Sequence, residues 1–143
     1  MRYVLVPLLA WALAQGLKHV FRLMGRNRRV FSKNPKSPLL LSGGMPSAHA
    51  ATVVSLTAVV ALYEGIDTVQ FAIVLWVTMI ILYDAMMVRF SSGQQGDMLN
   101  QLLDEQKSSL PRIRVAHGHT PVEVAVGTTI GMLVSLVVFF ATK

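Results

Sequence analysis

Four long apolar segments divide the chain, and each approaches the length needed to cross a membrane. A transmembrane helix needs about 20 mostly apolar residues to span the ~30 Å hydrocarbon core of a bilayer. The segments are residues 3–24, 45–63, 69–88 and 121–141. The last two are the clearest, because most of their length carries no charge. The pattern predicts an all-α fold, an integral membrane four-helix bundle that forms a single domain over residues 1–143.

A shorter amphipathic segment lies between the third and fourth apolar segments. Within residues 96–107, apolar side chains recur at helical spacing opposite charged ones: Met98, Leu99, Leu102 and Leu103 against Asp104 and Lys107. Pro111 follows this segment, and Pro121 suits the first turn of the last helix. We expect a short interfacial helix here, lying on the membrane surface.

The connections between the apolar segments differ in charge. Residues 22–36 contain basic side chains and no acidic ones, whereas the link after the second segment contains Glu64 and Asp67 and no base. Positively charged loops are retained in the cytoplasm. The first link and the connection over residues 89–120 are therefore expected in the cytoplasm, and the acidic link outside. We expect the protein in the plasma membrane.

Composition narrows the class of partner. Hydrophobic residues make up 53% of the chain and charged residues 14%, against about 25% charged in an average soluble domain. The net charge of +6 comes from basic residues between apolar runs, not along one solvated face. Membrane lipids and phosphorylated lipids are thus expected partners, and nucleic acid is not. The absence of cysteine excludes disulfides and thiolate metal sites.

The predicted topology brings the unusual polar residues to one membrane face. They stand at the ends of the segments that meet there: Lys18, Ser47, His49, Asp84, Arg89, His119 and Glu123. Charged and titratable groups at membrane depth are costly unless they are paired or solvated. Such a cluster is a hypothesis for a functional site on the cytoplasmic face.

The stretch over residues 42–49 is a candidate phosphate cradle. Gly44 lets the backbone approach a ligand, and Ser47 precedes a helix whose N-terminus favours anions. The alternative is a Gly-Gly turn followed by a serine N-cap, with His49 as an ordinary interfacial histidine.

The stretch over residues 117–123 is a candidate catalytic pair. His119 and Glu123 are four residues apart at the start of the last segment, so the carboxylate can hold one ring nitrogen and leave the other free. A plain helix-start pair is the alternative, and His117 is expected to be an exposed loop residue.

A metal ion is a second candidate ligand for the same cluster. His49, Asp84, His119 and Glu123 offer nitrogen and oxygen ligands. The sequence contains no recognised zinc spacing, and the basic Lys18 and Arg89 favour an anion over a metal, with a metal that bridges to phosphate as the alternative. We therefore expect neither a metal nor another cofactor.

Several of these stretches together resemble the divergent PAP2 family. Residues 43–49 resemble the PSGH-type second motif of PAP2 phosphatases, and residues 119–123 resemble the His-x-x-x-Asp end of the third motif, with Glu in place of Asp. Residues 84–89 and the Gly93-Gln94 pair complete the resemblance, which extends over nearly the whole chain and implies a PAP2-like core.

The resemblance implies a ping-pong phosphatase that hydrolyses a lipid or isoprenoid phosphate. His119 would attack phosphorus, and Glu123 would orient the imidazole of His119. His49 would protonate the leaving alcohol. The phosphate would be held by a further set, Lys18, Gly44, Ser47 and Arg89, with Asp84 and Gln94 as auxiliary residues.

The chain also departs from the usual PAP2 pattern. Ordinary PAP2 enzymes have an arginine six residues before the nucleophilic histidine, where this chain has Ile113, so the phosphate-binding role of that arginine is assigned to Arg89. Of the first PAP2 motif, the chain keeps only Lys18. The chain has fewer spans than usual, which leaves room for a homodimer in which a second protomer completes the fold. A membrane binder or carrier of lipid phosphates is the alternative function, and a purely structural membrane protein is the third.

Overall fold

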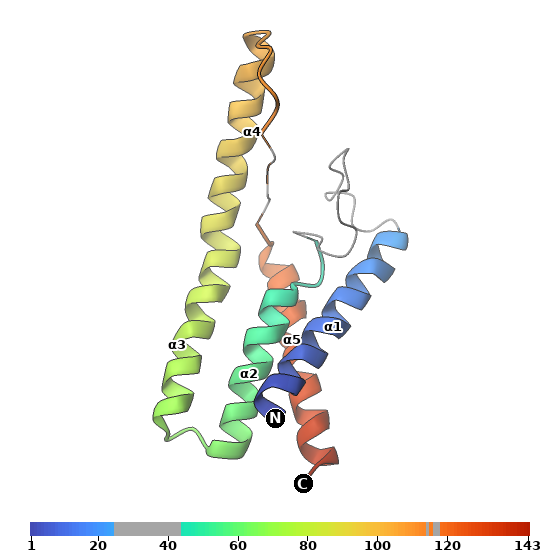
Figure 1. Ribbon diagram of the computed structural model, residues 1–143, viewed down its shortest axis with the longest axis vertical. Coiled ribbons are helices and arrows are strands. Elements are labelled where there is room, and N and C mark those ends of the chain that lie inside the picture. The colour runs from blue at the N-terminus through green and yellow to red at the C-terminus, as the bar shows by residue number, and fades with distance from the viewer. Residues whose placement is uncertain (25–43, 114, 116–117) are drawn as a thin grey trace.

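The computed structural model describes residues 1–24, 44–113, 115 and 118–143, and its described part is built of helices (Figure 1). In chain order they are α1 (Arg2–Leu23), α2 (Ala48–Glu64), α3 (Val69–Tyr83), the π-helical turn η2 (Asp84–Val88), α4 (Arg89–Glu105) and α5 (Pro121–Ala141). Three stretches are long and apolar enough to cross a membrane: Arg2–Phe21, Val69–Glu105 and Pro121–Ala141. The shorter apolar α2 is the fourth helix, which confirms the predicted all-α membrane bundle.

Helix α2 lies at the centre and packs most closely on α5. A Cβ atom added at Gly127 would lie 2.3 Å from the carbonyl oxygen of Ser47, and one at Gly131 would lie 2.4 Å from that of Ala51. Only glycine allows the two backbones to approach so closely. Lipid is as apolar as leucine, so close packing of small residues is what holds membrane helices together. Helix α1 joins α2 through an alanine cluster: Ala10, Ala14, Ala48 and Ala51.

Hydroxyl pairs join the helices inside the apolar bundle. The Oγ atoms of Ser55 and Ser135 are 2.9 Å apart and link α2 to α5. The Oγ1 atoms of Thr57 and Thr78 are 2.7 Å apart and link α2 to α3. Each pair satisfies polar groups that would otherwise face hydrocarbon, where they are costly.

Aromatic and charged side chains close the end of the bundle where both termini lie (Figure 1). Tyr3 donates a hydrogen bond to Glu64, the hydroxyl of Tyr63 lies 2.8 Å from Oγ1 of Thr142, and the guanidinium of Arg2 lies 4.2 Å from the Tyr63 ring centroid. Tyrosine is enriched at membrane interfaces, where its ring is buried and its hydroxyl stays wet. These contacts tie α1, α2 and α5 together at that end.

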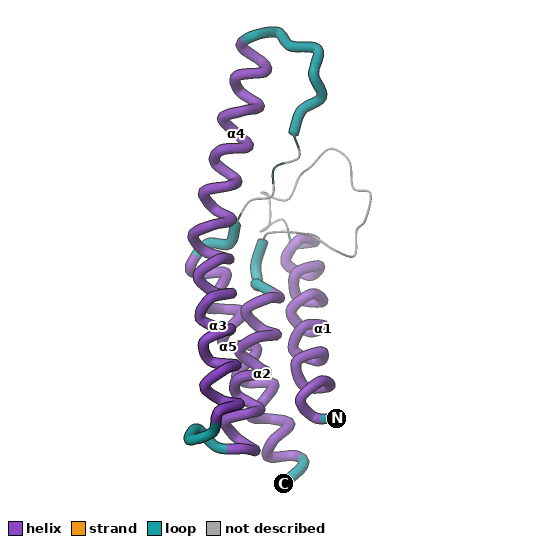
Figure 2. The backbone as a smooth tube through the Cα atoms, turned by 60° about the vertical axis from the view of Figure 1, so that its left-hand side comes forward, coloured by secondary structure: helices purple, strands orange, loops and turns teal. Residues whose placement is uncertain are grey.

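The predicted interfacial helix takes a different form in the structure. Helix α4 begins at Arg89, not at residue 96, and continues α3 through η2 as one helical stretch of 37 residues. Helix α4 projects beyond the bundle, along the long axis of the bundle, and does not lie across its end (Figures 1 and 2). At ~1.5 Å per residue, α4 extends about 25 Å past η2. No proline interrupts residues 89–105, and polar contacts with the returning chain stabilise the extension.

Candidate functional site

His119 and Glu123 form a shielded pair at the start of α5. Nδ1 of His119 lies 3.3 Å from Oε2 of Glu123, and the side chains are 6% and 16% exposed. The same carboxylate accepts a hydrogen bond from the Thr120 backbone N–H at 3.0 Å, while the Thr120 hydroxyl accepts one from the Glu123 N–H. This capping box fixes the carboxylate at the helix start.

The pair has a direct chemical consequence for the imidazole. An ionised carboxylate can only accept hydrogen bonds, so it favours the tautomer of His119 that carries a proton on Nδ1. Nε2 then keeps its lone pair. The predicted contact between the carboxylate of Glu123 and one ring nitrogen of His119 is present in the structure.

The start of α2 supplies the next part of the site. Ser47 is fully buried, and its hydroxyl accepts a hydrogen bond from the Ala50 N–H at 3.3 Å, so the alternative of a serine N-cap is confirmed. Gly44 is buried with φ of 81°, in the left-handed region that favours glycine. The contribution of both residues to phosphate binding stays a prediction.

His49 lies in the first turn of α2 and is exposed. It interacts electrostatically with Lys18 of α1, Asp84 of η2, Arg89 of α4 and His119, which precedes α5. The second histidine therefore faces the same cluster as the first.

Lys18 brings α1 to the cluster. Its side chain is only 3% exposed, and it interacts electrostatically with Glu123. A lysine is almost never buried to this degree unless it is paired. The interaction draws the end of α1 toward the start of α5.

Asp84 and Arg89 form an ion pair across η2, with Nε of Arg89 2.7 Å from Oδ2 of Asp84. The pair is solvated, since the side chains are 39% and 54% exposed. Asp84 thus holds the guanidinium through Nε.

Two backbone hydrogen bonds lock these segments together. The N–H of Ser47 donates to the carbonyl oxygen of Glu123 at 3.1 Å, which joins the start of α2 to the start of α5. The N–H of His119 donates to the carbonyl oxygen of Ala85 at 3.0 Å, which joins α5 to η2. Residues that are far apart in sequence are thereby held at one end of the bundle.

Comparison with known proteins shows the family of the chain. Residues 1–134 match the divergent PAP2 family. The chain belongs to this family. It is also 32% identical over 114 residues to the uncharacterized membrane protein YuiD of Bacillus subtilis (strain 168), a match that covers 69% of this chain and 72% of that protein. No solved structure matches the chain.

Some of the predicted residues of this divergent PAP2 protein lie away from the cluster. Gln94 is exposed on α4, more than one turn beyond Arg89. Arg112, which neighbours the position of the usual PAP2 arginine, is held instead by Asp104, with Nη2 2.8 Å and 2.9 Å from its carboxylate oxygens. His117 lies outside the described residues, as does most of the basic link over residues 22–36.

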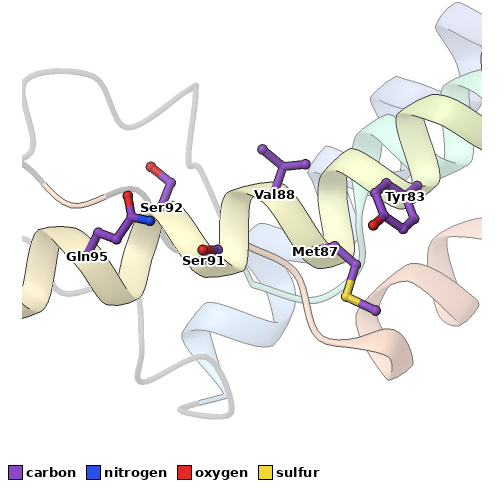
Figure 3. Close-up of a pocket in the computed structure, with 6 residues that line it drawn as sticks. All are labelled: Tyr83, Met87, Val88, Ser91, Ser92 and Gln95. Carbon is purple, nitrogen blue, oxygen red and sulfur yellow. The ribbon is translucent and has the colours of Figure 1, made fainter.

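An open groove lies along the end of α3, η2 and the start of α4 (Figure 3), and no histidine lines it. Its lining consists of Tyr83, Met87, Val88, Ser91, Ser92 and Gln95. The groove contains none of the charged residues assigned to the site, so the candidate chemistry rests on the cluster at the helix ends.

The described residues contain no group of three or more His, Cys, Asp or Glu side chains arranged to hold a metal ion. Three features of the site were not predicted from the sequence. They are the hydrogen bond from the Thr120 N–H to the Glu123 carboxylate, the hydrogen bond from the His119 N–H to the Ala85 carbonyl, and the close approach of Gly118 to the backbone of Arg89 and Phe90. The Thr-x-x-Glu spacing of a capping box could have revealed the first. The other two depend on the π-helical turn, for which the sequence carries no signal.

Proposed function

We propose that this divergent PAP2 protein hydrolyses a lipid or isoprenoid phosphate at the membrane through a phosphohistidine intermediate. The observation that carries the proposal is the shielded His119–Glu123 pair, in which the carboxylate lies 3.3 Å from Nδ1. Family membership supports it, and so does the resemblance of residues 119–123 to the end of the third PAP2 motif.

In the first step, Nε2 of His119 attacks phosphorus and the bond from phosphorus to the alcohol oxygen breaks. His49 gives its proton to the departing alcohol. The imidazole of His119 becomes positively charged as the P–N bond forms, and Glu123 stabilises that charge. A charge that develops in a shielded site is stabilised more strongly than one in water.

In the second step, water attacks the phosphorus of the phosphohistidine. His49, now neutral, takes a proton from that water, the P–N bond breaks, and inorganic phosphate leaves. His119 returns to the neutral tautomer that Glu123 favours. A nucleophile oriented by a carboxylate and a separate acid and base are the parts that covalent catalysis requires.

The anionic oxygens of the substrate would be held by cations from two elements. Lys18 approaches from α1 and Arg89 from the start of α4, and the first turn of α2 adds its N-terminal dipole. An arginine whose Nε is already held by a carboxylate presents its terminal nitrogens as a fork that matches two phosphate oxygens.

A membrane-bound substrate fits the position of the cluster. The site residues stand where apolar helices end, so a phosphate headgroup can reach them while its chain stays in the hydrocarbon. We further propose that the protein resides in the plasma membrane with the site on the cytoplasmic face, which the basic excess of the first link supports.

The test is phosphate release by the detergent-purified chain from a panel of lipid and isoprenoid phosphates, beside a His119→Ala variant. We expect release by the parent chain, loss of release in the variant, and acid-labile phosphate trapped on the parent chain only. Binding of lipid phosphate by both chains without release by either would instead support a non-catalytic binder.

A further inference from the structure

The turn η2 has a backbone feature that the proposed chemistry does not explain. In a regular α-helix the N–H of Arg89 would donate to the carbonyl of Ala85, four residues earlier. Here it donates to the carbonyl of Asp84, five residues earlier, which is the π-helical pattern. The carbonyl of Ala85 accepts a hydrogen bond from the N–H of His119 at 3.0 Å instead.

Gly118 lies directly against this turn. A Cβ atom at this position would lie 2.5 Å from the backbone nitrogen of Phe90 and 2.9 Å from the carbonyl carbon of Arg89. Both are backbone atoms that cannot rotate away. The residue before the histidine must therefore be glycine if the His119 N–H is to reach the Ala85 carbonyl.

The returning chain is also fastened further along α4. The side-chain amide of Asn100 pairs with the backbone of Ile113, donating from Nδ2 to the carbonyl at 3.0 Å and accepting from the N–H at 2.9 Å. Val115 packs against Gly96 in the same interval. These contacts fasten Ile113 and Val115 to α4.

We propose that η2 is a socket that positions the imidazole of His119 for attack, and that Gly118 and Asn100 are positioning residues for the reaction. The inference rests on the proposed function. The π-helical turn makes the carbonyl of Ala85 available, and that carbonyl accepts the hydrogen bond from the His119 backbone. The hydrogen bonds between Asn100 and Ile113 hold the returning chain against α4. Glu123 fixes the ring from the other side, so backbone and side chain of His119 are both held.

The test compares Gly118→Ala with Gly16→Ala, since a Cβ atom at Gly16 meets nothing within 4 Å. A displacement of about 1 Å at a reacting group can lower the rate about 100-fold. We expect Gly118→Ala to lower kcat by this order while KM and the inhibition constant for inorganic phosphate change less than about threefold, since the cations stay in place. Gly16→Ala should match the parent chain in all three.

If Gly118→Ala does not fold, a second variant tests the same proposal. Asn100→Ala should lower kcat by less than Gly118→Ala does and leave KM unchanged. Gln95 is exposed on the same helix, and Gln95→Ala should keep the parental kcat. A parental kcat in Gly118→Ala, or in Asn100→Ala when the glycine variant does not fold, would overturn the proposed positioning role of η2. The proposed phosphatase activity would be unaffected by that result. Equal losses in kcat and phosphate affinity also overturn it, because they indicate general disruption. A parent chain that releases no phosphate overturns both proposals.

Discussion

Replacing Glu123 by glutamine separates the two interactions that its carboxylate makes. In the structure Oε2 lies 3.0 Å from the Thr120 nitrogen and 3.3 Å from Nδ1 of His119. Glutamine can keep the first contact, because its amide oxygen also accepts a backbone hydrogen bond in a capping box. It cannot keep the negative charge that the second contact offers to a phosphorylated imidazole.

The magnitude of the loss follows from the distance and the burial. Two unit charges 3.3 Å apart attract by about 5 kcal/mol at an effective dielectric constant near 20. At ~1.36 kcal/mol per tenfold change in rate, that energy corresponds to an upper limit of a few thousand-fold. We expect kcat of Glu123→Gln to fall between about 100-fold and this limit.

The matched control is Thr120→Ala, which removes the capping hydroxyl and keeps the carboxylate. Loss of an N-cap side chain costs about 1 kcal/mol of stability. Thr120→Ala should therefore lower the unfolding temperature in detergent and leave most of the activity. Glu123→Gln should keep the parental unfolding temperature and lose most of the activity. Phosphate release and thermal unfolding of both variants measure this. A Glu123→Gln chain with at least a third of the parental kcat would refute the reasoning and reduce Glu123 to a capping residue.

Three further predictions follow from the helix ends and the packing. His49→Ala should slow release from an alkyl phosphate lipid by about 100- to 10,000-fold and from an aryl phosphate of low leaving-group pKa far less; equal losses on both substrates would contradict its role as an acid. Gly127→Ala should lower the free energy of unfolding by about 1–3 kcal/mol, because the new Cβ would lie 2.3 Å from the Ser47 carbonyl oxygen; a thermal transition equal to that of the parent chain would speak against the close α2–α5 contact. The chain lacks cysteine, so Asp67→Cys and Ser109→Cys report membrane sidedness directly: we expect Asp67→Cys to react with an impermeant thiol reagent from outside and Ser109→Cys only from the cytoplasm, and the opposite pattern would reverse the topology.

The sequence alone determined the class of fold, because the length and apolar character of a membrane helix are local properties. Residues 121–141 were predicted with the bounds that α5 has, since Pro121 marks its first turn. The pairing of His119 with Glu123 was also predicted from the sequence, because the two residues are four apart across the start of one helix.

The tertiary structure decided what joins the segments. The predicted break between the third helix and the amphipathic segment is absent, because η2 carries α3 into α4 and the returning chain satisfies the polar face of the extension. The burial of Lys18 and the bond from His119 to the Ala85 carbonyl depend on contacts between segments far apart in sequence. Local patterns cannot specify such contacts, since they arise only when backbones approach as closely as Gly118 and Gly127 allow.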